Sequence, residues 1–219
     1  MREVTSGVWQ IGLAPRNAVN AYLIGETLID AGTSGMGKKL PQRLSAHRVS
    51  AHALTHAHPD HAGGSKAVCE AFGVELWAPA GDAADVERGA PTLPPGAWTT
   101  PLLKRARGLP AHPVARQLAE GDEVAGFTVL EVPGHSPGHV AYWHEADRVL
   151  IAGDVFVNIH MLTMRPGLRS PPRVLTYDPG RNEASMRRLA ELRPRVALFG
   201  HGPPVFDAEA KLAAFVEKL

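Results

Sequence analysis

The sequence predicts an α/β fold in which helices cover the outside of packed β-sheets. The first observation is that apolar runs with strand composition dominate each half of the chain, and segments with helical spacing of apolar residues close each half. The second is that 19 prolines and 22 glycines occur among the 219 residues, which indicates many tight turns between short elements.

The first thirty residues are expected to form a strand meander, because three apolar segments are separated by turn residues. A turn-rich segment and a short amphipathic helix follow. A strand over 49–56 then runs into a histidine-rich stretch. A helix over 61–73 and a strand over 74–79 complete this part of the chain.

Residues 88–115 differ from their surroundings. Six prolines interrupt any regular element there, and the stretch KRAR at 104–107 adds three positive charges. Two interpretations stay open: a solvated surface loop, or a lid or binding loop inserted beside a functional site.

The second half again places helices after strands. Strands are expected over 123–132, 139–144, 148–153 and 195–200, and a loop over 167–180. A helix is expected over 182–193 with Asn182 as its N-cap, and a C-terminal amphipathic helix is expected to begin at Asp207.

The composition excludes several classes of protein. An apolar content of 44% and a charged content of 21% are typical of soluble globular proteins. The single cysteine, Cys69, cannot form an internal disulfide, which favours a reducing compartment and a cytoplasmic location. We expect no membrane partner, because no apolar signal region or membrane-length run occurs. A net charge of +1 gives no general attraction to nucleic acid, so we expect no nucleic-acid partner. The oligomeric state is not predicted.

The stretch THAHPDH holds three histidines and an aspartate within seven positions. In an extended segment, residues two apart point to the same side, so His56 and His58 can bind one ion. Pro59 favours an extended conformation at His58. Asp60 and His61 lie where the chain turns into its helix and can face a second ion. This spacing predicts a metal site rather than a polar loop that happens to be rich in histidine.

Three further motifs supply the ligands that such a site still needs. EVPGHSPGH contains His135, IAGDVF contains Asp154 and LFGHGPP contains His201. Each follows an apolar strand and lies on a glycine-containing turn, at the strand ends where α/β proteins commonly place their sites. Five imidazoles and two carboxylates suit two divalent metals such as zinc, with open positions for water and substrate.

The other histidines are assigned different places. His139 is expected to be a buried residue behind the ligands rather than a ligand itself. His47, His52, His112 and His144 are expected at the surface or at helix ends.

These motifs, in this order, resemble those of the metallo-β-lactamase superfamily. THAHPDH is similar to its HxHxDH signature, PGHSPGH to its third-histidine motif, GDVF to its bridging aspartate and GHGPP to its last histidine. NAYLIGETLIDAGTS is similar to its opening strands, so the matches extend from about residue 17 to 205. The resemblance implies a four-layer αββα sandwich with the metal site at one edge of the two sheets. It also implies a single domain over 1–219, since the ligands are distributed along the chain.

Carried over position by position, the resemblance implies that the first metal is held by His56, His58 and His135. It implies a second metal held by Asp60, His61 and His201, with Asp154 bridging both ions and Asp30 bracing the ligand loop from behind. Zinc is the favoured metal, with iron or manganese as alternatives.

The motif pattern is most similar to the hydroxyacylglutathione hydrolase (glyoxalase II) group of that superfamily. This implies a small-molecule substrate and hydrolysis of a thioester or ester by a metal-bridging hydroxide, with Asp60 and Asp154 as catalytic residues. Two alternatives stay open. One is a lactonase of the same superfamily. The other is a persulfide dioxygenase with a single iron, which would be held by His56, His135 and Asp154.

The substrate contacts are harder to predict. Full-length glyoxalase II enzymes bind glutathione with a helical extension, whereas residues 202–219 provide only one helix after His201. An anionic substrate would therefore need other cations, and the candidates on two loops are Lys104, Arg105, Arg107, Arg165, Arg169 and Arg173. His160, Arg165 and Tyr177 are predicted to contact the substrate, although these loops could equally be exposed basic segments.

Overall fold

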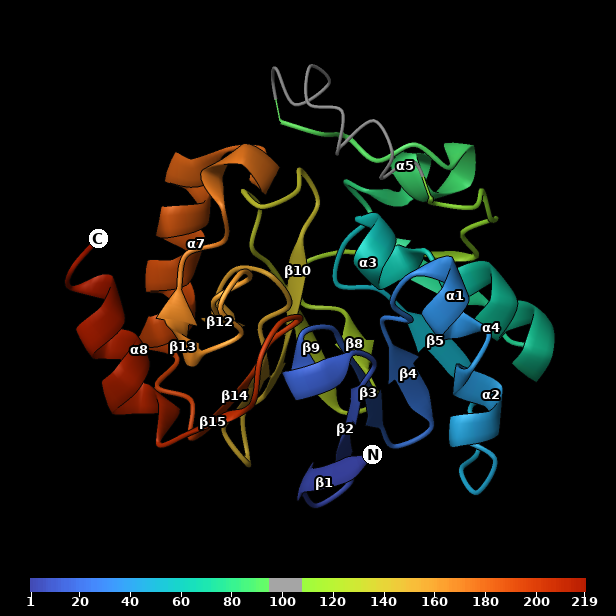
Figure 1. Cartoon of the computed structure of the whole chain (residues 1–219), viewed down its shortest axis with the longest axis horizontal. Coiled ribbons are helices and arrows are strands. Elements are labelled where there is room, and N and C mark those ends of the chain that lie inside the picture. The colour runs from blue at the N-terminus through green and yellow to red at the C-terminus, as the bar shows by residue number, and fades with distance from the viewer. Residues whose placement is uncertain (95–107) are drawn as a thin grey trace.

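The computed structural model describes residues 1–94 and 108–219. These residues form four layers, in which two β-sheets lie face to face and helices cover the outer face of each sheet (Figure 1). The predicted αββα sandwich is therefore confirmed. The single domain over 1–219 stays a prediction, and residues 95–107 of the predicted loop insertion lie outside the described residues.

The first sheet contains seven of the described strands, in chain order: β1 (Arg2–Thr5), β2 (Val8–Gly12), β3 (Asn20–Ile24), β4 (Thr27–Ile29), β5 (Ala51–Ala53), β6 (Leu76–Pro79) and β7 (Arg116–Leu118). The strands from β1 to β4 pair antiparallel, which confirms the predicted meander. The strands from β4 to β7 pair parallel, so the chain must cross over one face of the sheet between them.

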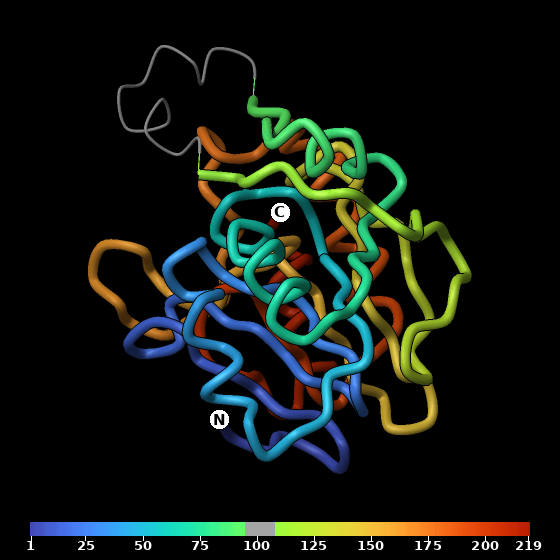
Figure 2. The backbone as a smooth tube through the Cα atoms, turned by 90° about the vertical axis from the view of Figure 1, so that its right-hand side faces the viewer, coloured from blue at the N-terminus to red at the C-terminus, as the bar shows by residue number. Residues whose placement is uncertain are grey.

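Helices on that face provide most of these crossovers. They are α1 (Ser34–Gly37) and α2 (Leu40–Arg43) before β5, α3 (Pro59–Ala62) and α4 (Ser65–Phe72) before β6, and α5 (Ala83–Arg88) after it. Helix α4 ends as predicted at Gly73, which adopts the left-handed conformation that glycine tolerates without steric cost. Figure 2 shows the helices of this layer from the front, with the strands behind them.

The second sheet contains six described strands in the order β15 (Val205–Phe206), β14 (Val196–Leu198), β11 (Val149–Ile151), β10 (Val140–His144), β9 (Phe127–Glu131) and β8 (Glu123–Val124). Helices α7 (Pro179–Glu191) and α8 (Ala208–Val216) cover its outer face. A separate two-stranded ribbon, β12 (Val157–Ile159) and β13 (Pro166–Arg169), follows β11. A 3-10 turn over Arg173–Leu175 connects this ribbon to α7, and another lies at Pro15–Asn17.

Alternation of side chains along the strands builds the layers. In β3, Tyr22 and Ile24 pack in the core between the two sheets, whereas Ala21 and Leu23 pack with residues of α2 and α4. In β10, Tyr142 lies between the sheets and Trp143 packs against α7 and its neighbours. Successive strand residues point to opposite faces, so a strand covered on both sides is apolar throughout.

Strand β3 also holds the loop that follows β14. The Asn20 amide donates to the carbonyl oxygens of Phe199 and Gly202, at 2.9 and 2.8 Å. The Tyr22 hydroxyl donates to Phe199 O at 2.7 Å and accepts from Phe199 N–H at 3.1 Å. Residues 177 or more positions apart are thereby fixed together in the core.

Some sequence predictions about single elements are wrong. Helix α7 begins at Pro179, and its N-cap is Asp178, whose carboxylate accepts from Arg181 N–H. Asn182, the predicted cap, lies inside the helix and donates to Val155 O. Part of the predicted loop over 167–180 belongs to β13, and the sequence prediction also omitted β7.

His52 is not at the surface or at a helix end but is fully buried in β5. Its Nδ1–H donates to Leu28 O at 3.0 Å, and its Nε2 accepts from the Ser65 hydroxyl at 2.8 Å. Burial, partly offset by the hydrogen bond to Leu28, lowers the pKa of His52 from 6.5 to about 4. The ring is therefore a neutral part of the core.

This burial predicts a loss of stability in mild acid. The unfolded chain takes up a proton at His52 below about pH 6.5, whereas the folded chain does so only near pH 4. The contribution of His52 to the free energy of unfolding is thus complete above pH 6.5. It decreases by up to roughly 3 kcal/mol as the pH falls to 4. Urea denaturation of chelator-treated protein at pH 6.5 and pH 4 measures this decrease in the free energy of unfolding. The decrease should be smaller in His52→Gln than in the unmodified protein, and an equal decrease in both would contradict the buried, neutral state of His52.

Among residues 1–94 and 108–219, no helix combines the length and the apolar character needed to cross a membrane.

Candidate metal centre

Four strands of the two sheets end at the candidate site. The chain leaves β5 into the His56–His61 segment, leaves β9 into the turn that carries His135, and leaves β11 and β14 into the turns of Asp154 and His201. His58 has an extended backbone with φ −70° and ψ 148°, and α3 starts at the next residue, Pro59. The predicted change from strand-like to helical backbone therefore lies within the HxHxDH motif itself.

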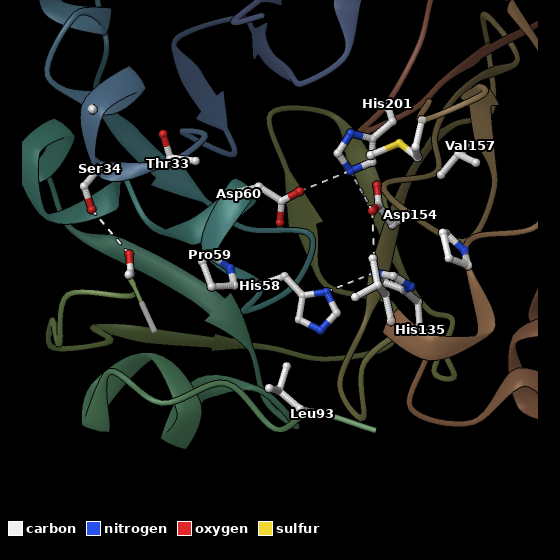
Figure 3. A pocket seen from close by; sticks show the side chains of 15 residues that line it. Thr33, Ser34, His58, Pro59, Asp60, Leu93, His135, Asp154, Val157 and His201 are labelled. Carbon is white, nitrogen blue, oxygen red and sulfur yellow. Dashed lines mark hydrogen bonds and ion pairs between the residues drawn. The ribbon is translucent and has the colours of Figure 1, made fainter. Parts of the chain in front are cut away.

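The seven predicted ligands lie together in three groups, within each of which the candidate ligand atoms are all within 4.8 Å of one another. One group contains His56, His58 and His135, and another contains Asp60, His61 and His201. A third contains His56, His61 and Asp154. Figure 3 shows His58, Asp60, His135, Asp154 and His201 converging from different elements on one space.

Asp154 lies between the first two groups. Its Oδ2 is 3.0 Å from Nε2 of His201 and 3.5 Å from Nε2 of His135, and its Oδ1 is 3.5 Å from Nε2 of His61. One carboxylate thus reaches imidazoles of both groups, which is the position that a bridging ligand requires.

The donor set fits divalent cations. Among the described residues, the imidazole nitrogens His56 Nε2 and His61 Nε2 and the carboxylate oxygen Asp154 Oδ1 are buried without a hydrogen-bond partner. Buried polar atoms rarely lack a partner, and a cation would provide one. The facing nitrogen and oxygen atoms of three side-chain pairs, His58–His135, His135–Asp154 and His201–Asp154, lie 3.0–3.5 Å apart. In a tetrahedral zinc site with bonds of about 2.0–2.1 Å, two ligand atoms are about 3.3 Å apart, so this spacing suits such an ion.

At three of the histidines the outer ring nitrogen has a hydrogen-bond partner, which leaves the inner nitrogen free to bind a cation. His61 Nδ1–H donates to Asp30 Oδ2 at 2.8 Å, and His201 Nδ1–H donates to Ala18 O. His56 Nδ1 lies 3.0 Å from Thr55 Oγ1. Such partners behind a metal ligand fix the orientation and the tautomer of its ring.

Asp30 lies behind the ligands, as the sequence analysis predicts. Besides His61, its carboxylate accepts from Thr55 N–H and from the Thr55 hydroxyl, both at 2.8 Å. Its backbone adopts a left-handed φ of 58°, which is uncommon outside glycine and asparagine but tolerated by aspartate. Asp30 therefore connects the end of β4 to the start of the ligand segment.

His139 also lies behind the ligands. The ring is fully buried, its Nε2 accepts from Asp154 N–H at 3.0 Å, and it stacks on His56 at a centroid distance of 4.7 Å. Burial lowers the pKa of His139 to about 3, so the ring is neutral and can accept that hydrogen bond. This contact fixes the backbone of Asp154.

The electrostatics favour the neutral, metal-binding form of His56 and His135 and the protonated form of His61 and His201, whose proton a cation would displace. Burial and the neighbouring rings lower the pKa of His56 and His135 well below the ordinary value. At His201 burial opposes the charged ring, but Asp154 outweighs it and raises the pKa to about 10. Despite burial, His201 and His61 lower the pKa of Asp154 well below its ordinary value. Asp154 is thus a carboxylate at neutral pH, in a buried site that requires compensating positive charge.

Asp82 is a buried residue of the site that the sequence analysis missed. It follows β6, and its carboxylate accepts from Ala57 N–H at 3.0 Å, from the Ser136 hydroxyl at 2.6 Å and from Gly138 N–H at 2.6 Å. These bonds connect the His56–His58 segment to the turn that carries His135. The signal that identified the ligands, an apolar strand followed by Gly-Asp, is also present here in VELWAPAGD.

Replacing Asp82 with alanine is expected to weaken metal binding by about 10- to 100-fold, the usual effect of removing groups that orient ligands. It should also lower the free energy of unfolding by roughly 2–5 kcal/mol, because buried donors lose their acceptor. Metal titration against a competing chelator measures the first effect. Asp85→Ala is the matched control: Asp85 is also buried, but its carboxylate bonds to Arg88 and Thr92 and not to the ligand segments. Equal losses of metal affinity in both variants would contradict the role of Asp82.

Gly200 lies immediately before His201 where no side chain fits. A methyl group at this position would overlap Asp154 Oδ1 and His61 Cε1. The absence of a side chain at residue 200 thus allows the β14 turn to approach the other ligands closely.

A cavity of about 500 Å³ opens above the cluster. Its floor contains five predicted ligands: His58, Asp60, His135, Asp154 and His201. Leu93 and Gly108, which flank the undescribed part of the 88–115 segment, also line the cavity. The role of that segment as a lid stays a prediction, and Lys104, Arg105 and Arg107 lie outside the described residues.

The structure does not bring the predicted substrate contacts to this cavity. His160, Arg165 and Tyr177 are absent from its lining. His160 Nδ1 instead accepts from the backbone N–H groups of Leu162 and Thr163 at 3.2 Å, within its own turn. The exposed side chain of Arg173 lies 3.8 Å from Glu183. Substrate contact by His160, Arg165 and Tyr177 stays a prediction.

The comparisons with known proteins agree with this arrangement. The sequence matches the metallo-beta-lactamase superfamily over residues 14–201. It is similar to the probable metallo-hydrolase YflN of Bacillus subtilis, with 27% identity over 199 residues that cover 81% of this chain and 75% of that protein. It is 34% identical over 168 residues to the hydroxyacylglutathione hydrolase of Cereibacter sphaeroides, covering 75% of this chain and 52% of that protein. The chain thus spans about half the length of that hydrolase.

Solved structures show the same fold. The metallo-beta-lactamase family protein TTHA1429 from Thermus thermophilus superposes with a TM-score of 0.70 and 27% identity, covering 99% of this chain and 80% of that one. The crystal structure of TTHA1623 in a di-iron-bound form has a TM-score of 0.69 and 30% identity, covering 92% of this chain and 96% of that one. By its sequence match, its layered sheets and its cluster of histidines and aspartates, this chain belongs to the metallo-beta-lactamase superfamily.

Proposed function

We propose that this protein is a binuclear metal-dependent hydrolase that cleaves a thioester or an ester. The observation that carries the proposal is the position of Asp154, whose carboxylate lies within 3.5 Å of imidazoles from both candidate ligand groups. Zinc is the metal we propose, since a set of histidines and carboxylates suits it. The di-iron form of TTHA1623 supports a two-ion site and makes iron the principal alternative.

Two divalent ions, when bound, lower the pKa of a water molecule and polarise the carbonyl group of a substrate. The first ion would be held by His56, His58 and His135, and the second by Asp60, His61 and His201. Asp154 would bridge them from the floor of the cavity.

Asp60 is the residue proposed to handle the proton. Its carboxylate lines the cavity, and one of its oxygens lies 3.3 Å from His201 Nε2. Although burial opposes ionisation, the positive charge beside Asp60, at His201 and His61, lowers its pKa below the ordinary value. Asp60 is therefore a carboxylate at neutral pH, able to orient the attacking water and to accept a proton for transfer to the leaving group.

The bond type is proposed from the relatives. Two of the similar proteins, from Cereibacter sphaeroides and Bdellovibrio bacteriovorus, are hydroxyacylglutathione hydrolases, at 34% and 29% identity. They support a thioester or ester, with a lactone as the alternative within the same chemistry. Because this chain spans only 52% and 46% of their lengths, their glutathione substrate is not carried over.

Elemental analysis of freshly purified protein, combined with a panel of thioesters, esters and lactones, tests the proposal. About two zinc or iron ions per chain and hydrolysis that is lost on chelation and restored by metal are the expected results. A single iron per chain, together with oxygen uptake in the presence of a persulfide, would replace the hydrolase by the dioxygenase. Metal-loaded protein that cleaves none of the panel would refute the proposed bond type.

A further inference from the structure

The side of the cavity above the ligands is largely apolar. The apolar residues that line it are Pro59, Leu93, Val157, Met161, Pro172 and Leu175. Four come from the chain that follows Asp154: Val157 begins the ribbon strand β12, Met161 lies in the β12–β13 turn, Pro172 precedes the 3-10 turn before α7, and Leu175 ends that turn. Figure 3 shows Val157 beside Asp154 and His201. We call Val157, Met161 and Leu175 the ribbon wall.

The polar groups of the lining outside the floor are few among the described residues. They include Thr33 and Ser34, and the Ser34 hydroxyl already donates to Gly63 O at 3.0 Å. No lysine or arginine of residues 1–94 and 108–219 lines the cavity. Three arginines of the adjacent ribbon and 3-10 turn, Arg165, Arg169 and Arg173, are exposed to solvent instead.

Resting on the hydrolase proposed above, we infer that the substrate carries an uncharged hydrocarbon acyl group, and that the ribbon wall binds it. The scissile carbonyl must reach the ligand floor, and the leaving group must depart to solvent. In the proposed reaction Asp60 passes a proton to the leaving group, so the leaving group lies on the Asp60 side of the floor. Figure 3 shows Val157 on the other side of Asp154 and His201, so the ribbon wall faces the acyl group, which is attached to the other side of the carbonyl carbon. Burial of an apolar chain there is favourable, whereas a carboxylate on the acyl group would lose its hydration without gaining a cation among the described lining residues.

A series of acyl thioesters of one thiol tests this inference. From acetyl through butyryl to hexanoyl, kcat/KM should rise, by roughly 10-fold between butyryl and hexanoyl if both added methylenes are buried. The anionic succinyl thioester should be hydrolysed more slowly than the butyryl thioester. Met161→Gln and Leu175→Gln should weaken this dependence on chain length. The neighbouring Leu162→Gln should not, because Leu162 is 90% exposed and does not line the cavity.

The outcomes separate the two proposals. Hydrolysis without a preference for longer chains, or with a preference for succinyl, would overturn the acyl-group inference and leave the hydrolase intact. If no thioester or ester is cleaved, the proposed hydrolase activity is refuted. A binding measurement then tests the acyl-group inference separately. Calorimetry should still show tighter binding of a hexanoyl amide than of a succinyl amide to the metal-loaded protein, and equal or reversed affinities would overturn it.

Discussion

Replacing Asp154 with asparagine should reduce hydrolysis on the order of 10³-fold or more and lower the bound metal from about two ions per chain to one or fewer. Asparagine is neutral, and only one of its two terminal atoms can accept. The carboxylate it replaces reaches His61 through Oδ1, and His135 and His201 through Oδ2. The variant would therefore lose both the negative charge and one arm of the proposed bridge.

Steady-state kinetics and elemental analysis of the same preparation measure the two effects together. Asp147→Asn is the control, because it makes the same chemical change at an exposed turn residue that pairs with His144. Full activity and full metal content in Asp154→Asn would show that Asp154 does not bridge the ions.

Replacing Gly200 with alanine should be nearly as damaging, although the residue carries no functional group. The added methyl would overlap atoms of Asp154 and His61, so at least one of them must move. Overpacking of this kind costs about 1–3 kcal/mol of stability. The larger effect falls on the ligands, and we expect metal affinity to decrease by about 100-fold or more, with a similar loss of activity.

Chelator competition and thermal unfolding distinguish displaced ligands from a general loss of stability. Gly180→Ala is the control, since a methyl there would make only an ordinary 3.5 Å contact with Asp178 in the first turn of α7. If Gly200→Ala bound metal as tightly as the unmodified protein, the proposed close approach of this turn to the ligands would be wrong.

The convergence of the ligands could be predicted because each lies where an apolar strand meets a glycine-containing turn. This pattern is local in the sequence, so it can be recognised without knowing the order of the strands in the sheets. The same signal is present at Asp82, yet a lone Gly-Asp turn is usually only a turn, and the three donors that Asp82 accepts from are remote in sequence. Only the folded chain brings those donors together.

Two other errors, at His52 and Asn182, also arise from tertiary contacts. His52 is polar, so the sequence placed it outside, but Leu28 and Ser65 satisfy both of its nitrogens within the core. Asn182 has the composition of a cap, but Asp178 lies one turn earlier, and the Asn182 amide donates to Val155 O across the layer. In both cases a hydrogen bond to a residue distant in the sequence outweighs the average preference of the residue type.

The hydrogen bonds from Asn20 and Tyr22 to the loop after β14 have a consequence for synthesis of the protein on the ribosome. The loop that carries His201 is anchored to a strand that is synthesised well before it, because the bonded residues lie 177 or more positions apart in the sequence. A nascent chain that has not yet exposed Gly202 can form the first ligand group but not the second. We therefore expect a partly synthesised chain to retain at most one ion, and the second to be acquired only after β14 has docked.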